Sequence, residues 1–351
     1  MIANILSKIE NGKEPAKKEL IQLFNPANDE EFARLIETAF NISRDNKKFI
    51  KLTSTIHITN LCYITPKCKY CGFAAGTSTA GYYRPFSKTN EEILKSAKII
   101  EEAGIPRVSC SGAHGYHGEQ AVRAAEIVKQ ETSLELLVNV GFDFDSNILR
   151  RLEDLGTDTV CCNIETINEA IFNDLKPGEV LDNRIKACRM ISESGIELSS
   201  GLLIGLGESH EDRINHLNFL RTIKGLGEIP IMGFNPYKGT PMENHPPCPL
   251  REQMITIAVT RILFPDIRIT VPTPTIGPEN VKYSLMAGAD NLATVIPENY
   301  PVEIKGVGSP ICGTLKDVIA VIREMGLKPQ PGPKKYHMTK TIPVGHVVRH
   351  D

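Results

Sequence analysis

The sequence lacks an excess of charge of either sign. Its 351 residues carry 40 lysines and arginines against 42 aspartates and glutamates, a formal net charge of −2. A protein that binds nucleic acid usually has a basic excess, and a solvating tail has a run of acidic residues. Neither pattern is present. We therefore expect no nucleic-acid partner.

The chain also lacks a run of about 18 apolar residues, which a helix needs to cross a bilayer. Residues 1–18 are charged and amphipathic, without the apolar centre of a secretory signal peptide. Both absences predict a cytoplasmic protein with no membrane partner.

The cysteines number nine, which is odd, and they are scattered along the chain. In a reducing compartment this pattern favours metal ligands and buried thiols over disulfides.

Strand-like and helix-like segments alternate from residue 51 onward. Thr89 and Glu92 form a capping box that predicts the start of one helix, and Gly104 predicts its end. Eight strands that alternate with helices predict an α/β fold, a (β/α)8 TIM-type barrel. The expected strands are 51–58, 106–110, 134–140, 158–164, 196–204, 229–234, 267–271 and 291–295. The expected helices are 90–103, 118–130, 145–155, 183–194, 210–224, 250–263 and 314–325.

The two ends of the chain differ from this alternating region. Residues 1–48 carry apolar side chains at helical spacing, which predicts an N-terminal helical cap of two or three helices. The barrel is expected to span residues 49–327. Residues 328–351, with Pro329, Pro331 and Pro333 before a Lys/His-rich end, are expected to form a C-terminal tail.

Three cysteines, Cys62, Cys68 and Cys71, directly follow the first expected strand. The loops after the strands form the active face of such a barrel. Thiolates select iron–sulfur clusters or zinc. A cubane cluster usually takes four cysteines, so three would leave one iron open to a ligand. From spacing alone, a structural zinc site with His57 as fourth ligand is the alternative.

The residues around these cysteines resemble the cluster loop of radical-SAM enzymes. Tyr70 stands immediately before Cys71, where that family carries an aromatic residue that packs near the adenine of S-adenosylmethionine. The family usually has three residues between its first two cysteines, whereas this sequence has five between Cys62 and Cys68. The radical-SAM proteins that build the iron-guanylylpyridinol cofactor of the mono-iron hydrogenase of methanogens share the five-residue spacing.

Further motifs resemble the biotin-synthase branch of that family and occur in the same order. Because they extend the similarity over about residues 50–330, they disfavour the zinc alternative. They are Cys162–Thr166, Gly201–Ser209 with Asp212 and Arg213, Lys238–Pro241, and Met286–Asp290.

The resemblance implies two cofactors, a 4Fe-4S cluster held by the three cysteines and S-adenosylmethionine. In the family the reduced cluster gives one electron to the sulfonium, which yields methionine and a 5′-deoxyadenosyl radical. That radical takes a hydrogen atom from the substrate, which the resemblance implies is a small molecule, while the protein positions the reactants and excludes water. An electron donor such as ferredoxin or flavodoxin is also implied.

Two polar residues, Asn163 and Glu165, alternate with apolar ones and so share one face of the fourth expected strand. The resemblance implies that they bind the ribose hydroxyls, with Glu165 as a longer substitute for the family's aspartate. A polar strand end facing solvent is the alternative. Arg184 falls where relatives bind the methionyl carboxylate, which a guanidinium can hold through two hydrogen bonds. Its alternative is a solvated arginine on a helix surface.

Three more positions are implied to contact S-adenosylmethionine. Ser111 and Gly112 end the second expected strand, where the family presents groups to the methionyl ammonium, although Gly112 could be only a tight turn. Ile204 resembles a position that packs on adenine, although it could equally be core. His114 and His117 follow in a glycine-rich loop, where histidines can contact substrate but are more often polar surface.

The sequence also predicts that no second cluster is present. Biotin synthase resembles this chain but holds a 2Fe-2S centre through three cysteines and an arginine. The matching positions here are Cys110, Leu137, Ser199 and Thr273, and a leucine cannot ligate iron. The space should then accept a substrate, unless these are ordinary core positions. Its expected lining is Asn139, Ser199, Asn235 and Thr273.

The resemblance therefore implies an enzyme that forms the pyridinol ring of the iron-guanylylpyridinol cofactor. Other reactions of the biotin-synthase branch remain alternatives: biotin synthesis, methylornithine formation and maturation of the di-iron hydrogenase. A non-catalytic metal-binding or scaffold protein is an alternative of a different class.

Overall fold

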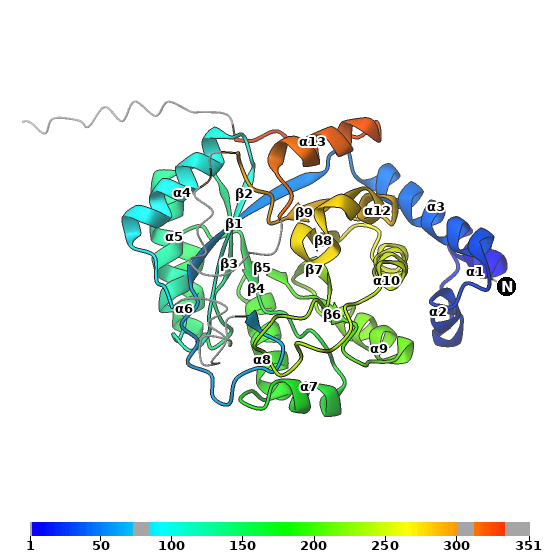
Figure 1. The fold of residues 1–351 in the computed structure, drawn as a ribbon, viewed down its shortest axis with the longest axis horizontal. Helices are drawn as coiled ribbons and strands as arrows, with labels where there is room; N and C mark the ends of the chain where they lie inside the picture. Colours follow the sequence, from blue (N-terminus) through cyan, green and yellow to red (C-terminus); the bar gives the residue numbers. More distant parts are fainter. Residues whose placement is uncertain (1, 73–84, 299, 301–311, 334–351) are drawn as a thin grey trace, which may run out of the picture.

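Parallel strands form a closed barrel in the computed structural model, which describes residues 2–72, 85–298, 300 and 312–333 (Figure 1). The strand order is β5-β4-β3-β2-β1-β9-β8-β7-β6, and β5 also pairs with β7, which closes the ring. The expected barrel is thereby confirmed. The strands are β1 (Lys51–Thr59), β2 (Arg107–Gly112), β3 (Glu135–Asn139), β4 (Thr159–Cys161), β5 (Glu197–Ser199), β6 (Leu202–Ile204), β7 (Leu226–Gly233), β8 (Arg268–Pro272) and β9 (Asn291–Ala293).

The expected strand 196–204 is in fact two short strands, β5 and β6. The pairing with β7 shifts register between Leu198 and Ser199, so β5 and β6 cannot form one regular ladder. At Gly201, between them, a Cβ atom would lie 1.9 Å from the carbonyl oxygen of Pro230 on β7. Only glycine permits this close approach of two backbones. β5 and β6 together occupy one of the eight positions in the barrel wall.

Helices cover the outside of the barrel (Figure 1). The capping box at Thr89 and Glu92 is present, and Gly104 ends that helix with a φ of +78°. Three short helices, α7, α11 and α12, were not expected. The helices after β1 are α4 (Asn90–Glu102), α5 (Glu119–Glu131), α6 (Ser146–Asp154), α7 (Glu169–Leu175), α8 (Leu181–Glu193), α9 (His210–Leu220), α10 (Leu250–Leu263), α11 (Thr273–Ile276), the 3-10 helix η2 (Pro278–Asn280), α12 (Val281–Met286) and α13 (Leu315–Glu324).

The N-terminal segment forms α1 (Ile2–Glu10), α2 (Lys17–Leu23) and α3 (Asp29–Asn46). These helices lie on the flank of the barrel beside α10, against which α3 packs (Figure 1). The start of the expected C-terminal tail is held beside Ile50 by two backbone hydrogen bonds. Ile50 N donates to Lys328 O at 2.8 Å, and Ile50 O accepts from Gln330 N at 2.7 Å. Residues 334–351 of the expected tail lie outside the described part. Of the helices in that part, none has the length and apolar character to cross a membrane.

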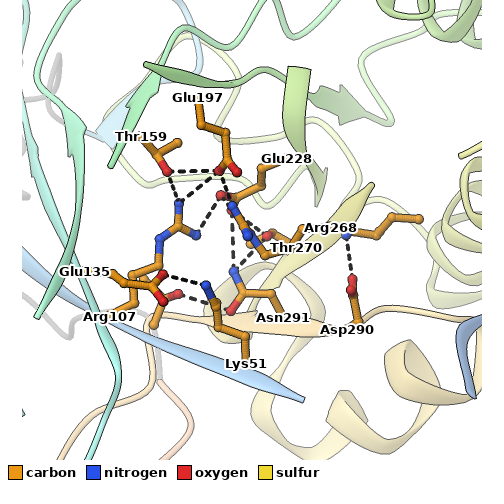
Figure 2. A network of polar contacts seen from close by, with 12 residues as sticks. Lys51, Arg107, Glu135, Thr159, Glu197, Glu228, Arg268, Thr270, Asp290 and Asn291 are labelled. Carbon is orange, nitrogen blue, oxygen red and sulfur yellow. Dashed lines mark hydrogen bonds and ion pairs between the residues drawn. The ribbon is translucent and has the colours of Figure 1, made fainter. Parts of the chain in front are cut away.

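Charged side chains fill the barrel at the amino ends of the strands (Figure 2). Arg107 and Glu228 are both buried, with Nη1 2.6 Å from Oε2. Lys51 pairs with Glu135, and Arg268 pairs with Glu197. Burial would raise the pKa of Glu228, but Arg107 and Arg268 lower it to about 2. This balanced layer, which we call the barrel floor, fills the end opposite the active face.

Candidate active site

The loop that follows β1, residues 61–72, lies at the carboxyl end of the barrel and is held by backbone hydrogen bonds to two other loops and to the last residue of α7. Tyr63 N donates to His114 O at 2.9 Å, and Lys69 N donates to Leu175 O at 2.9 Å. Lys69 O accepts from Met242 N at 3.3 Å. These contacts fix the segment that carries the three cysteines, and we call it the cluster loop.

Cys62, Cys68 and Cys71 are partly exposed, and none of them is in a disulfide. The Sγ atom of Cys68 lies 3.7 Å from Oε1 of Glu179. Across the described residues, no three His, Cys, Asp or Glu side chains already stand in an arrangement that could hold a metal ion. The donor set itself fits an iron–sulfur cluster, because three thiols on one fixed loop supply soft ligands. Their role as cluster ligands stays a prediction.

Glu165 is anchored through one of its two carboxylate oxygens. Oε2 accepts a hydrogen bond from the hydroxyl of Tyr70 and forms an ion pair with Nζ of Lys176 at 2.7 Å. Within the described residues no hydrogen bond reaches Oε1, and the side chain is 18% exposed. β4 ends at Cys161, earlier than expected, and Glu165 has a φ of +70°. One oxygen is therefore fixed by the protein, and the other can accept a hydrogen bond from a ligand.

Asn163 is anchored in the same way. Its Oδ1 accepts from the backbone N–H of Gly201 at 3.0 Å, which leaves the Nδ2 donor. Asn163 and Glu165 lie beyond the end of β4, next to the gap between β5 and β6. The pair thus offers one donor and one acceptor at the carboxyl end of the barrel.

Arg184 lies on α8 and is buried, with only 3% of its side chain exposed. The alternative of a solvated surface arginine is therefore wrong. Nε donates to Oε2 of Glu179 at 2.5 Å, Nη1 donates to Asn163 O at 2.5 Å, and the guanidinium lies 4.4 Å from the ring centre of Phe142. Burial would lower the pKa of Arg184, but Glu179 raises it above its usual value. Nη2 has no partner in the described part of the chain.

Sequence reasoning missed two charged residues of this site, Lys176 and Glu179. Both side chains are buried, at 4% and 1% exposed. Burial would raise the pKa of Glu179, but Lys176 and Arg184 lower it to about 2. A signal was available, since both residues flank Pro177 and Gly178 in a loop that follows the fourth strand on the active face. At Gly178 a Cβ would lie 2.3 Å from Pro66 O, so this loop packs directly on the cluster loop.

The residues at the end of β2 meet those at the end of β3. Ser111 Oγ accepts from Asn139 Nδ2 at 3.2 Å. A Cβ at Gly112 would lie 3.2 Å from Thr59 O, so this glycine lets β2 pack closely on β1.

The two histidines of the loop after β2 differ in their surroundings. His114 Nδ1 lies 4.0 Å from Glu179, and burial lowers the pKa of His114 to about 3. The side chain of His117 is 87% exposed and pairs with Asp143.

A cavity of about 450 Å³ opens at the carboxyl ends of β7 and β8. Of the four residues expected to line a substrate site, its lining contains Asn235 alone. Ser199 and Thr273 are fully buried, as is Ile204 at the end of β6. Among the described lining residues Glu279 is the only charged one. The lining is Asn235, Pro236, Tyr237, Cys248, Leu250, Gln253, Pro274, Thr275, Ile276, Gly277, Pro278, Glu279 and Asn280.

Comparison with known proteins identifies the family. Residues 56–220 match the Radical SAM superfamily, and residues 230–328 match the Biotin and Thiamin Synthesis associated domain. The biotin synthase of Thermotoga neapolitana is 30% identical over 229 residues, 64% of this chain and 76% of that protein. This chain belongs to the radical SAM superfamily.

The similarity to a biotin synthase and the associated domain place this radical SAM enzyme in the biotin-synthase branch, and two further comparisons add a relative and a matching fold. An uncharacterized protein of Methanocaldococcus jannaschii, MJ0785, is 55% identical over 318 residues, 91% of this chain and 85% of that protein. The crystal structure of methylornithine synthase superposes with a TM-score of 0.81 at 22% identity, covering 93% of this chain and 97% of the other. Radical SAM enzymes use a 4Fe-4S cluster and S-adenosylmethionine. The non-catalytic zinc-binding alternative is therefore wrong.

Proposed function

We propose that this radical SAM enzyme builds the pyridinol part of the iron-guanylylpyridinol cofactor of mono-iron hydrogenase. The observation that carries the proposal is the five-residue spacing between Cys62 and Cys68, which the proteins of that pathway share. The 55% identity to a protein of a methanogen is consistent with it.

The barrel interior supports a reaction other than sulfur insertion. Arg107, Ser109 and Ser111 alternate along β2 on the inner face, where Arg107 contacts Glu228 and Ser111 contacts Asn139. Cys110 therefore points outward, and it packs in the hydrophobic core. A second, sulfur-donating cluster inside the barrel would therefore lack thiolate ligands. A reaction that inserts no sulfur into the substrate fits this interior better.

In this proposal Cys62, Cys68 and Cys71 hold the 4Fe-4S cluster. When bound, the cluster and S-adenosylmethionine supply one electron and a carbon radical that removes a hydrogen atom from the substrate. Asn163 Nδ2 and Glu165 Oε1 bind the two ribose hydroxyls, one as donor and one as acceptor. The residues expected to surround S-adenosylmethionine are Tyr70, Ser111, Gly112, Asn163, Glu165, Arg184 and Ile204.

Arg184 would hold the methionyl carboxylate through Nη2, because Nε and Nη1 are already occupied. Its position is fixed before the cofactor arrives, so little side-chain entropy is lost on binding. An electron donor such as ferredoxin or flavodoxin would reach the cluster loop from solvent, since Tyr63 of that loop is exposed.

The cavity beside β7 and β8 fits a substrate that hydrogen-bonds but carries no free carboxylate. Its described lining offers the amides of Asn235, Gln253 and Asn280 and no lysine or arginine. A free amino acid would bring a carboxylate that finds no cation there. A heteroaromatic precursor with hydroxyl or carbonyl groups would find donors and acceptors instead.

The proposal is tested by deleting the gene in a host that makes mono-iron hydrogenase. Hydrogenase activity should disappear, and feeding synthetic pyridinol should restore it. Wild-type activity in the deletion strain, or failure of pyridinol to restore it while the intact cofactor does, would contradict the proposal. In parallel, the reconstituted enzyme should leave lysine and dethiobiotin unchanged. Formation of methylornithine or biotin would assign it to another reaction of the branch.

A further inference from the structure

Lys176 lies where the cluster loop, the end of β4 and the start of α8 come together. Its Nζ is 2.7 Å from Oε2 of Glu165 and 3.8 Å from Oε1 of Glu179. The same nitrogen lies 5.8 Å from the ring centre of Tyr70 and 5.5 Å from that of Phe172. Two carboxylates and two aromatic faces therefore surround one buried ammonium.

Of the two carboxylates, Glu165 is the principal partner of Lys176. Both contacts are ion pairs, and the attraction between opposite charges is stronger at 2.7 Å than at 3.8 Å. Glu179 also has Arg184 as a closer cation, at 2.5 Å. Removing the Lys176 ammonium should thus disturb Glu165 more than Glu179.

The contact also decides which oxygen of Glu165 is available. Tyr70 donates to Oε2 and the ammonium of Lys176 pairs with the same oxygen, which turns Oε1 away from them. Without Lys176 the carboxylate could rotate about its terminal torsion, which is broad for glutamate. The backbone at Glu165 has a φ of +70°, so the residue is placed by its surroundings and not by its own preference.

We propose that Lys176 is a positioning residue for S-adenosylmethionine, which aims Oε1 of Glu165 at the ribose of the cofactor. It acts through Glu165 and does not itself touch the ligand. This inference rests on the cofactor site proposed above. It also accounts for a glutamate where the family has an aspartate, because the additional methylene lets Oε2 reach Lys176 while Oε1 still faces the ligand.

The test separates the two halves of the cofactor. The K176M variant is loaded with its cluster anaerobically, and its affinities for 5′-deoxyadenosine and for methionine are measured separately by calorimetry. We expect 5′-deoxyadenosine to bind about tenfold or more weakly, the loss typical of one charged hydrogen bond, and methionine to bind as in the wild type. K186M, which changes an exposed lysine of α8, is the matched control.

A double-mutant cycle with E165Q tests whether Lys176 acts through Glu165. K176M should weaken 5′-deoxyadenosine binding in the wild-type background and have little further effect in E165Q. An equal loss in both backgrounds, or an equal loss for methionine, would overturn the inference. If E165Q alone leaves 5′-deoxyadenosine binding unchanged, the proposed cofactor site is wrong; if E165Q weakens it and K176M does not, only the role of Lys176 is wrong.

K176R serves as a second variant should the methionine variant not fold or not take up iron. It keeps the buried cation but alters the reach of the donor. Its 5′-deoxyadenosine affinity should change in the wild-type background and not in E165Q. The same change in both backgrounds, or no change in either, would overturn the inference.

Discussion

Arg184 and Glu179 form a buried ion pair, with Nε 2.5 Å from Oε2, directly beside Cys68. The pair fixes the guanidinium before any ligand binds, and within the described residues Nη2 is the nitrogen that has no partner. Because of this pair, replacing Arg184 by alanine should affect the stability of the protein as well as its affinity for the ligand. Removing the cation leaves Glu179 buried with Lys176 as its nearest cation, at 3.8 Å.

The R184A variant should therefore lose both affinity and stability. Loss of a charge-assisted hydrogen bond should weaken S-adenosylmethionine binding about ten- to hundredfold. Breaking a buried pair from one side should lower the free energy of unfolding by about 3–5 kcal/mol. The double variant R184A/E179Q should recover stability but not affinity. Calorimetric titration and denaturant unfolding measure the two effects, and recovery of affinity in the double variant would remove Arg184 from the ligand site.

Replacing Cys62, Cys68 and Cys71 together by alanine should abolish the cluster. Wild-type protein should take up about four irons per chain on anaerobic reconstitution, as a cubane cluster requires. The triple variant should take up none, and C188A, which removes a buried core thiol, should load normally. Iron analysis and the visible absorption band give the readout. Zinc as the only tightly bound metal after reconstitution would contradict the assignment.

The barrel floor makes stability depend on pH through Glu228. In the folded protein the pKa of Glu228 is lowered from 4.5 to about 2, because the positive charges of Arg107 and Arg268 outweigh the increase that burial would cause. A lowered folded pKa contributes stability that is present above the unfolded value and is lost as pH falls toward the folded one. Wild-type stability should therefore fall between about pH 4.5 and pH 2, and E228Q should lose this part of the dependence.

At neutral pH, E228Q should be less stable by about 3–5 kcal/mol, because Arg107 keeps a buried charge without its carboxylate. The matched control is E119Q, which breaks the exposed pair of Glu119 with Arg151 and should cost about 0–1 kcal/mol. Urea unfolding at a series of pH values measures both. An E228Q profile parallel to that of the wild type at low pH would show that Glu228 does not carry the transition.

The barrel could be predicted from the sequence because its signals are local and periodic. The capping box at Thr89 and Glu92 and the stop at Gly104 are present as expected. The split between β5 and β6 could not be predicted, since it arises from the approach of Gly201 to Pro230 on another strand. Helix α7 has seven residues, too few for a helical pattern to stand out.

Only those residues of the site that belong to a recognisable motif could be predicted from the sequence. Glu165 and Asn163 were recognised by their alternation, but their partners lie far along the chain or across strands. Lys176 and Glu179 read in sequence as ordinary charged residues of a loop. Only the fold reveals that both are buried and paired, because burial depends on how that loop packs on the cluster loop.

The last prediction is that the barrel holds no second iron–sulfur cluster. The positions matched to the ligands of that cluster are filled by residues that cannot replace them. Leu137 has no ligand atom, Ser199 is fully buried, and Thr273 Oγ1 already donates to Thr294 O at 2.8 Å. Cys110 lies on the outer face of β2, away from the other three. Reconstituted protein should therefore bind about four irons and not six, and C110A should bind as many as the wild type. Mössbauer spectra should contain the cubane cluster alone. A 2Fe-2S signature that disappears in C110A would show that this thiol reaches the barrel interior and would reopen sulfur insertion as the reaction.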